Sequence, residues 1–383
     1  MEFYGFSFSL IELIVFAVLL LAFIYQFYFY FRYLNGVLHY RTKIKNDEIP
    51  FLAEPEPVSV IICARDEAEN LRKYLPLILD QEYPEFEVIV INDGSTDQTE
   101  HLLRDLSVNY PRLKTTFVPA GANNLSTKKL GLTLGIKAAK YEYLLFTDAD
   151  CMPEDKMWIA RMARNFTRQT DFVLGYGAYL QEKGFLNRLI TYDTLFIALQ
   201  YLGMAAARKP YMGVGRNLAY RKETFFAQKG FASTLHLISG DDDLLVNKAA
   251  TSANTRIEIS PDSITWSEPN KTFMGWLYQK ERHLSVSSYY KSSSKFRLFL
   301  EPFTRGLFYL AFILALVFGS WITQIATGVL FLARFIIQLS IINSSSKYFG
   351  GRKYILTLPI FDILLPLISL RILIFGKKTQ HRW

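Results

Sequence analysis

Two long apolar stretches enclose a segment of ordinary globular composition, and this arrangement limits the possible fold more than any other feature. Residues 10–31 are nearly uncharged, and most of residues 303–375 is apolar as well. A helix needs about 20 apolar residues to cross a bilayer. Half of the residues are hydrophobic and 15% are aromatic, both high values for a soluble protein. The sequence therefore predicts a globular domain held between membrane segments.

The first apolar stretch is expected to be a retained membrane anchor. No basic segment precedes it, no small-residue cleavage site follows it, and Glu2 and Glu12 lie on its leading side, so a cleaved signal peptide is not expected. Basic residues gather in residues 32–45 just after it. Because positive charge favours the cytoplasmic side, we expect an integral membrane protein whose globular domain is cytoplasmic.

The net charge of +8 does not indicate a nucleic-acid partner. Much of the positive charge lies beside the apolar stretches, where it suits anionic membrane lipids. Basic and aromatic residues are not interleaved in the way that binds single strands. The two cysteines, Cys63 and Cys151, are expected to be small buried fillers in a reducing compartment, without a disulfide.

Strand and helix patterns alternate from residue 57 onward. Apolar strand patterns cover residues 58–63, 87–91, 115–118 and 143–147, and helical spacing follows, for example over 67–80 and 128–140. Asp66 is placed to cap the first helix, and Ser95 with Gln98 to form a capping box at the next one. Strict alternation predicts an α/β fold with a mainly parallel sheet.

Charged residues follow the strands at the edge where such sheets bind ligands. Arg65, Asp93, and the pair Asp148 and Asp150 come directly after three of the strands. Alternation along a strand makes Asp148 and Asp150 point the same way. Two adjacent carboxylates suit a hard divalent cation that also bridges phosphate oxygens; the alternative is a pair of solvated loop aspartates. Neither glycine-rich nucleotide fingerprint is present.

Six motifs together carry a resemblance to a known family. They are VSVIICARDEAENL, INDGSTDQT, LLFTDADCMP, GVGRNLAYRK, SGDDDLL and QKERH. Their order is typical of family 2 glycosyltransferases with a GT-A fold, and the match covers residues 57–283. The chain is similar to bacterial members, to ceramide glucosyltransferase and to polysaccharide synthases. The resemblance implies inverting transfer from a nucleotide-sugar, a UDP-sugar being expected, in a bacterial plasma (inner) membrane.

The resemblance also assigns the donor site. The nucleotide-sugar would contact Ala64, Glu67, Asp93, Lys128, Asp148, Gln279 and Arg282. Asp150, together with Asp148, would hold Mg²⁺ or Mn²⁺. Simpler alternatives are a turn-forming role for Asp93 and a solvated helix position for Lys128.

Two further segments resemble the reacting end of the family site. Aligning SGDDDLL with the family's acidic motif makes Asp242 the general base, with Asp241 as the second choice; the alternative is an acidic cap on the following helix. Gly215, Arg216 and Asn217 resemble the loop that contacts the donor sugar and the acceptor, unless they form only a glycine turn.

The motif QKERH departs from the family pattern QxxRW at its last position. Trp276, Gln279 and His283 share one helix face, with Arg282 at its edge. In the family this helix lies on the membrane surface and closes over the nucleotide, and Arg282 would pair with the diphosphate. The missing tryptophan removes a platform for a growing glycan. The alternative is an interfacial helix without a catalytic role.

The predicted organisation has six parts: an anchor (1–32), a linker (33–56), a GT-A domain (57–283), an interfacial segment (284–302), C-terminal membrane segments (303–376) and a basic tail (377–383). We expect the last apolar segment, interrupted by Pro359, Asp362 and Pro366, to be a hairpin that does not cross. Arg334 is expected either to snorkel or to approach a lipid phosphate.

These expectations lead to one function and two alternatives. The first is a transferase that adds sugar to a lipid or lipid-linked glycan acceptor at the cytoplasmic face. A processive polysaccharide synthase is the alternative within the same class, and a non-catalytic membrane scaffold is the alternative outside it. Retention of Asp93, Asp148, Asp150, Asp242 and Arg282 argues against the scaffold, which needs no base.

Overall fold

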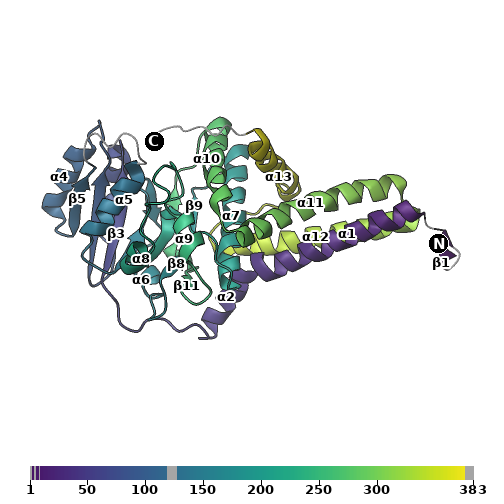
Figure 1. Ribbon diagram of the computed structural model, residues 1–383, viewed down its shortest axis with the longest axis horizontal. Helices are drawn as coiled ribbons and strands as arrows, with labels where there is room; N and C mark the ends of the chain where they lie inside the picture. The colour runs from purple at the N-terminus through teal and green to yellow at the C-terminus, as the bar shows by residue number, and fades with distance from the viewer. Residues whose placement is uncertain (1, 4–5, 8, 119–126, 376–383) are drawn as a thin grey trace.

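The computed structural model describes residues 2–3, 6–7, 9–118 and 127–375. A globular domain lies at one end, and three long helices extend from it as an arm (Figure 1). These helices are α1 (Leu10–Phe29), α11 (Ser292–Phe318) and α12 (Trp321–Tyr348). A two-stranded pair, β1 (Glu2–Phe3) and β2 (Phe6–Ser7), lies at the far tip of the arm.

A seven-stranded sheet forms the centre of the globular domain, in the order β11-β8-β10-β6-β3-β4-β5. The strands are β3 (Val58–Ala64), β4 (Phe86–Asn92), β5 (Leu113–Phe117), β6 (Tyr143–Phe146), β8 (Phe172–Leu174), β10 (Leu218–Arg221) and β11 (Thr255–Ile257). β6, β3, β4 and β5 are parallel, as the alternation predicted, whereas β10 is antiparallel to both β6 and β8.

The two faces of the sheet are buried by different helices because side chains alternate along each strand. Val60 and Ile62 of β3 pack into one apolar cluster, which includes residues of α3 (Ala68–Leu79), α4 (Thr99–Asn109) and α6 (Trp158–Ala163). Ile61 belongs to the opposite cluster, with residues of α5 (Thr127–Ala138), α7 (Phe185–Ala206) and α9 (Asp243–Ala249). Every residue of β3 is therefore buried.

Smaller elements complete the domain. A second sheet has the order β7-β12-β9, formed by β7 (Cys151–Pro153), β12 (Thr265–Ser267) and β9 (Gly177–Tyr179). The remaining helices are η2 (Gly215–Asn217), α8 (Lys222–Ala227), η3 (Pro261–Ser263), α10 (Phe273–Val286) and η4 (Ser287–Tyr289). β7 follows Asp148 and Asp150 directly, so the backbone on the C-terminal side of the acidic pair is held in this sheet.

The predicted helix caps are wrong. Asp66 does not cap the helix that follows it; its carboxylate accepts hydrogen bonds from the backbone of Thr96 (2.6 Å) and Asp97 (3.3 Å). The Ser95 hydroxyl in turn accepts from the backbone N–H of Asp66 (3.0 Å). α4 begins at Thr99, and Gln98 makes no side-chain cap. The polar residues of the two strand-to-helix turns thus bind each other, because parallel strands bring these turns together.

Several helices run past the boundaries expected for the arm. After α1, a π-helical turn, η1 (Tyr30–Leu34), leads into α2 (Gly36–Lys45), so the predicted linker begins as helix. α11 starts at Ser292 and continues through Pro302 without a break. Within the described part of the chain, five helical stretches are long and apolar enough to cross a membrane; one of them, α7, is mostly buried in the globular domain.

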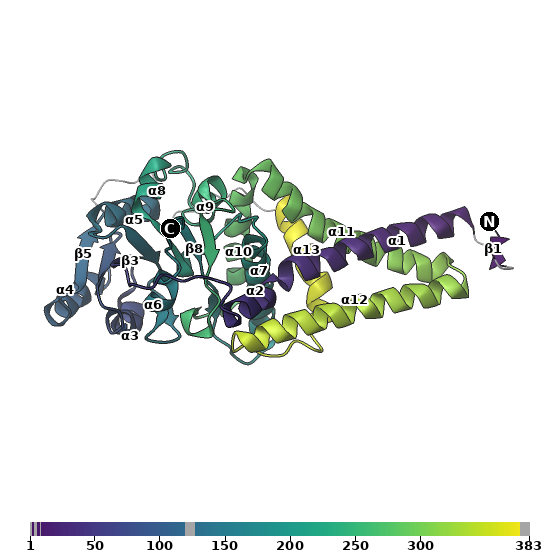
Figure 2. The ribbon, with the colours of Figure 1, turned by 90° about the horizontal axis from the view of Figure 1, so that it is seen from below.

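The last apolar segment is one helix, α13 (Leu358–Phe375), so the predicted hairpin is wrong. Pro366 is accommodated within it. Figure 2 shows α13 running across the direction of α1, α11 and α12, close to the globular domain. Both expectations for Arg334 are also wrong, because its guanidinium is buried and bonds Asp362 of α13 (2.7 Å) and the Tyr30 hydroxyl (2.8 Å). The predicted basic tail lies outside the described residues.

Candidate functional site

Two adjoining cavities lie beyond the carboxyl ends of β3 and β6. The larger is lined by seven of the predicted residues: Glu67, Lys128, Asp148, Asp150, Arg216, Gln279 and Arg282. The smaller is lined by Gly215, Asp241 and Asp242, and it shares Lys128 and Asp148 with the larger. Segments far apart in the sequence therefore meet at one edge of the sheet.

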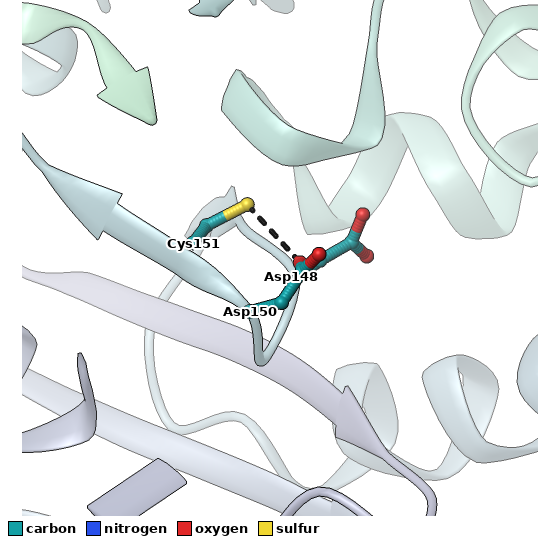
Figure 3. Close-up of side chains that lie close together, drawn as sticks. All are labelled: Asp148, Asp150 and Cys151. Atoms are coloured by element: carbon teal, nitrogen blue, oxygen red, sulfur yellow. Dashed lines mark hydrogen bonds between the residues drawn. The ribbon is translucent and has the colours of Figure 1, made fainter. Parts of the chain in front are cut away.

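Asp148 and Asp150 form the acidic pair that the sequence predicted. Figure 3 shows them beside Cys151, and the possible ligand atoms of the three residues lie within 4.8 Å of one another. Burial, and then the charge of Asp148, raise the pKa of Asp150. A divalent cation would relieve this repulsion, and Mg²⁺ or Mn²⁺ prefers carboxylate oxygens.

Cys151 does not add a natural ligand for such a cation. Its thiol is buried, and burial, followed by the charges of the two aspartates, raises its pKa above the ordinary value. The thiol lies 3.6 Å from Oδ1 of Asp150 and 3.0 Å from the Ser267 hydroxyl. It therefore stays protonated and packs under the pair, as the small buried filler that the sequence predicted.

Lys128 joins the acidic pair to the acidic run. Its Nζ lies 3.1 Å from Oδ1 of Asp148 and 3.4 Å from Oδ2 of Asp241. Burial alone would lower the pKa of Lys128, but the two carboxylates outweigh it and raise the pKa. Burial likewise favours neutral Asp148, yet the lysine lowers its pKa overall. Lys128 is therefore a largely covered cation of the site, 12% exposed, and not a solvated helix residue.

The acidic run occupies the start of α9. Oδ2 of Asp242 accepts the backbone N–H of Gly215 (2.7 Å), and Oδ1 accepts that of Asp243 (2.7 Å). Burial, and then the charge of Asp241, raise the pKa of Asp242 to about 6. Asp242 is also the N-cap of α9. The helix-capping alternative thus describes its position, and the cap still presents a carboxylate of near-neutral pKa to the smaller cavity.

Lys129 belongs to the surroundings of the site but was not found from the sequence. Its side chain is fully buried, and Nζ donates to the carbonyl oxygens of Thr234 (2.8 Å), Leu237 (3.0 Å) and Ser239 (2.7 Å). These residues belong to the turn-rich segment that leads into the acidic run. The adjacent lysines 128 and 129 were the available signal in the sequence. Lys128 pairs with the aspartates of the site, and Lys129 binds the carbonyl groups of the segment before the acidic run.

α10 forms one wall of the larger cavity through Gln279 and Arg282. The Gln279 amide donates to the Tyr179 hydroxyl (2.9 Å), and the Tyr179 ring lies 4.2 Å below the guanidinium of Arg216. Tyr179 is a site residue that the sequence did not indicate. On the other side of α10, Lys280 binds both carboxylate oxygens of Asp193 on α7 at 2.8 Å. This buried pair fixes the helix against the domain.

His283 stands where the family pattern has a tryptophan, and its side chain is exposed. Trp276, two turns earlier on the helix, is buried in the apolar core. Neither residue therefore gives a glycan the flat aromatic surface that a tryptophan at position 283 would provide.

Three predicted residues do not line either cavity. Asn217 is buried, donates to the carbonyls of Tyr176 (2.9 Å) and Ser263 (2.7 Å), and supports the loop from behind. Ala64 is buried at the end of β3. Asp93 is buried beside it, and burial raises its pKa. Among the described residues, Oδ2 of Asp93 has no hydrogen-bond partner.

The fold and the site define the class of protein. The sheet is mainly parallel, with an acidic pair at a strand end that Lys128 faces. Residues 59–226 match the family model described as Glycosyl transferase family 2. The chain therefore contains a family 2 glycosyltransferase domain, as predicted, and the predicted GT-A fold class is confirmed.

Individual relatives agree with this assignment. The chain is 37% identical over 100 residues to poly-beta-1,6-N-acetyl-D-glucosamine synthase of Staphylococcus epidermidis, an alignment that covers 26% of this chain and 23% of the synthase. It is 25% identical over 286 residues to the probable glycosyltransferase YdaM of Bacillus subtilis, covering 72% of this chain and 66% of YdaM. The chain thus spans about a quarter of the synthase.

A solved structure has the same fold over nearly the whole chain. The mannosyltransferase PcManGT of Pyrobaculum calidifontis, solved with GDP-Man and Mn²⁺, superposes with a TM-score of 0.57 at 17% identity. The superposition covers 96% of this chain and all of that one. At this identity the likeness concerns the fold alone.

Proposed function

We propose that this protein transfers a sugar from a nucleotide-sugar to a lipid or lipid-linked glycan acceptor at the cytoplasmic face of a bacterial plasma membrane. The observation that carries the proposal is the meeting of the acidic pair, Lys128 and the acidic run in two adjoining cavities. A non-catalytic scaffold would have no use for a cavity-lining carboxylate whose pKa is near neutral.

The larger cavity suits a diphosphate. Lys128, Arg216 and Arg282 line it together with the acidic pair. A guanidinium matches phosphate oxygens with its planar fork of donors. Asp150 and Asp148 would hold Mg²⁺ or Mn²⁺, and the ion, when bound, neutralises charge on the departing diphosphate. The unpartnered Oδ2 of Asp93 supports its assignment to the nucleoside, for which a uridine is proposed.

A lipid acceptor is supported by the position of α10. This cavity wall packs against α13 of the arm and carries exposed Phe273 and Met274. Phe296 and Phe299, near the start of α11, are exposed as well. An apolar surface beside the cavity allows a lipid to present its head group without leaving the bilayer.

The acidic run supplies a general base for inverting transfer. Asp242 is proposed for this role because its pKa of about 6 keeps it ionised yet basic at neutral pH. Asp241 is the second choice, favoured by its contact with Lys128. If a bound diphosphate drew this lysine away, the carboxylate of Asp241 would be released toward the acceptor.

Two measurements test the proposal. Membranes containing the protein are incubated with a panel of sugar nucleotides, and nucleotide release and labelled lipid are assayed together. Asp242→Asn and Asp241→Asn are then compared in donor binding and single-turnover transfer. The base variant should bind donor normally while turnover falls by a factor of about 10²–10⁴. Failure of every donor to yield a glycolipid or glycan would refute the proposed function.

A processive polysaccharide synthase is the second candidate. It is favoured by the similarity to poly-beta-1,6-N-acetyl-D-glucosamine synthase, which covers part of the catalytic domain. The smaller, partly polar ring of His283 at the tryptophan position favours short products instead. The size distribution of the product made by the purified protein decides between them.

A further inference from the structure

The junction between α10 and the arm is hydrogen-bonded to the helix that carries the acidic run. Tyr290 and Lys291 connect η4 to α11. The Tyr290 hydroxyl donates to Oδ2 of Asp243 (2.5 Å), and the backbone N–H of Lys291 donates to Oδ1 of Asn247 (2.8 Å). Two consecutive residues immediately before α11 thus form hydrogen bonds to α9, at positions one helical turn apart.

The contact between Tyr290 and Asp243 is buried, and neighbouring residues support both side chains. Tyr290 and Asp243 are 7% and 6% exposed. The Tyr290 ring lies 6.3 Å from the ring of Tyr211, and the carbonyl of Tyr211 accepts the Asn247 amide (2.7 Å). Tyr211 therefore contacts both Tyr290 and α9. Because the contact is buried, water does not readily replace the Tyr290 hydroxyl.

Asp243 depends on this hydroxyl more than an ordinary carboxylate would. Among the described residues, its Oδ1 has no hydrogen-bond partner. Burial, and then the charge of Asp242, raise its pKa well above the ordinary value. Burial also raises the pKa of Tyr290, so the hydroxyl keeps its proton and donates it. Loss of the hydroxyl would leave the whole buried carboxyl group without a side-chain partner.

The link reaches the candidate base in one further step. The backbone N–H of Asp243 donates to Oδ1 of Asp242 (2.7 Å), whose other oxygen is held by Gly215. A shift of Asp243 therefore moves the donor that orients Asp242. The chain of contacts runs from the start of α11, through Tyr290 and Asp243, to Asp242.

We infer that Tyr290 is a positioning residue that couples the membrane arm to the acidic run, so that the seating of α11 sets the orientation of the candidate base. The inference rests on the proposed function only for the identity of that base. α11 packs along α1 through much of the arm, so the position of Tyr290 is fixed by the arm as a whole. The arm then does more than anchor the domain, because it also completes the site.

The test uses Tyr290→Phe in the full chain, reconstituted in lipid nanodiscs. This change keeps the ring and removes only the hydroxyl. The adjacent Tyr289→Phe is the matched control, because Tyr289 is 56% exposed and lies beside His236. We expect Tyr290→Phe to lower kcat about tenfold, as for the loss of one buried hydrogen bond, with donor KM unchanged. Tyr289→Phe should resemble the wild type.

A double-mutant cycle with Asp243→Ala shows whether the tyrosine acts through Asp243. We expect the double variant to be no slower than the worse single variant. Additive losses in kcat would overturn the inference, as would an equal rise in donor KM without a change in kcat.

Amide hydrogen exchange tests the coupling without an assay of sugar transfer. In Tyr290→Phe the amides of residues 241–247 should exchange faster than in the wild type and in Tyr289→Phe. Unchanged exchange there would overturn the coupling, even for an active enzyme. An inactive wild type with the expected exchange pattern would instead refute the proposed function and leave the coupling supported.

Discussion

The guanidinium of Arg334 on α12 lies 2.7 Å from Oδ2 of Asp362 on α13, and both side chains are buried. Arg305 of α11 approaches the other oxygen of the same carboxylate (3.2 Å). One aspartate therefore binds cations from two helices of the arm. Glu301 pairs with Arg305, so the four charges balance. This cluster explains how α13 is held across the direction of the other helices.

Replacing Asp362 by alanine should destabilise the protein strongly. Two buried guanidinium groups would lose their shared partner, and breaking such a pair from one side costs about 3–5 kcal/mol. We expect a clear fall in the thermal midpoint of the detergent-solubilised protein. Ile363→Ala, at the next, half-exposed position, is the control. A midpoint equal to the control's would contradict this account of α13.

Asp150→Ala should abolish transfer together with cation-dependent donor binding. The acidic pair is the cation site proposed here, and Asp148 alone is already paired with Lys128. Cys151→Ser serves as the control and should retain activity, because its protonated thiol is not an expected ligand. Donor binding is titrated with and without Mn²⁺. Full wild-type activity in excess chelator would show that no cation is needed.

The transfer rate should depend on pH through Asp242. A base must be ionised, and the pKa of this carboxyl group is raised to about 6. Below that pH the protonated form prevails, so the single-turnover rate should fall about tenfold per pH unit, and above it the rate should level off. A pH–rate profile of wild type against Asp242→Asn checks this. The same acidic limb in the variant would move the base role to another residue.

Lys128 and Lys129 should fail in different ways when each is changed to methionine. Lys128→Met removes a cation from the donor cavity, so donor KM should rise. Lys129→Met leaves three carbonyl groups of residues 234–239 without their buried donor, so kcat should fall and this segment should become sensitive to protease. Steady-state kinetics and limited proteolysis separate the two. Identical changes in kcat and KM in the two variants would show that the two lysines do not have separate roles in donor binding and in holding the segment.

Products should be short. A chain-extending enzyme holds its product between additions, and His283 offers a smaller, partly polar ring where a tryptophan would give a flat apolar surface. We expect one sugar, or very few, on each acceptor. Thin-layer chromatography of radiolabelled product should show discrete lipid-soluble species. A high-molecular-weight ladder from the purified protein alone would favour the synthase.

The sequence was sufficient for the parts of the molecule that depend on local pattern. Alternating strands and helices gave the four parallel strands, and the position of Asp148 and Asp150 after a strand placed them at the ligand-binding edge. Ten of the candidate site residues line the two cavities, although their roles remain proposals. These successes share a cause: backbone periodicity and strand-end position are properties of neighbouring residues.

Only the tertiary structure decided the partners of polar groups. Asp66 binds the next turn instead of its own helix, and Lys129 meets carbonyls about 105–110 residues away. The charges of Arg334 and Asp362, which suggested lipid contact and a broken helix, neutralise each other inside the arm. A buried polar group must find a partner wherever the fold offers one, and that partner is usually distant in the chain. The sequence by itself therefore determined the strands, the apolar helices and the edge of the sheet that holds the site, whereas the packing of distant segments determined which charges meet.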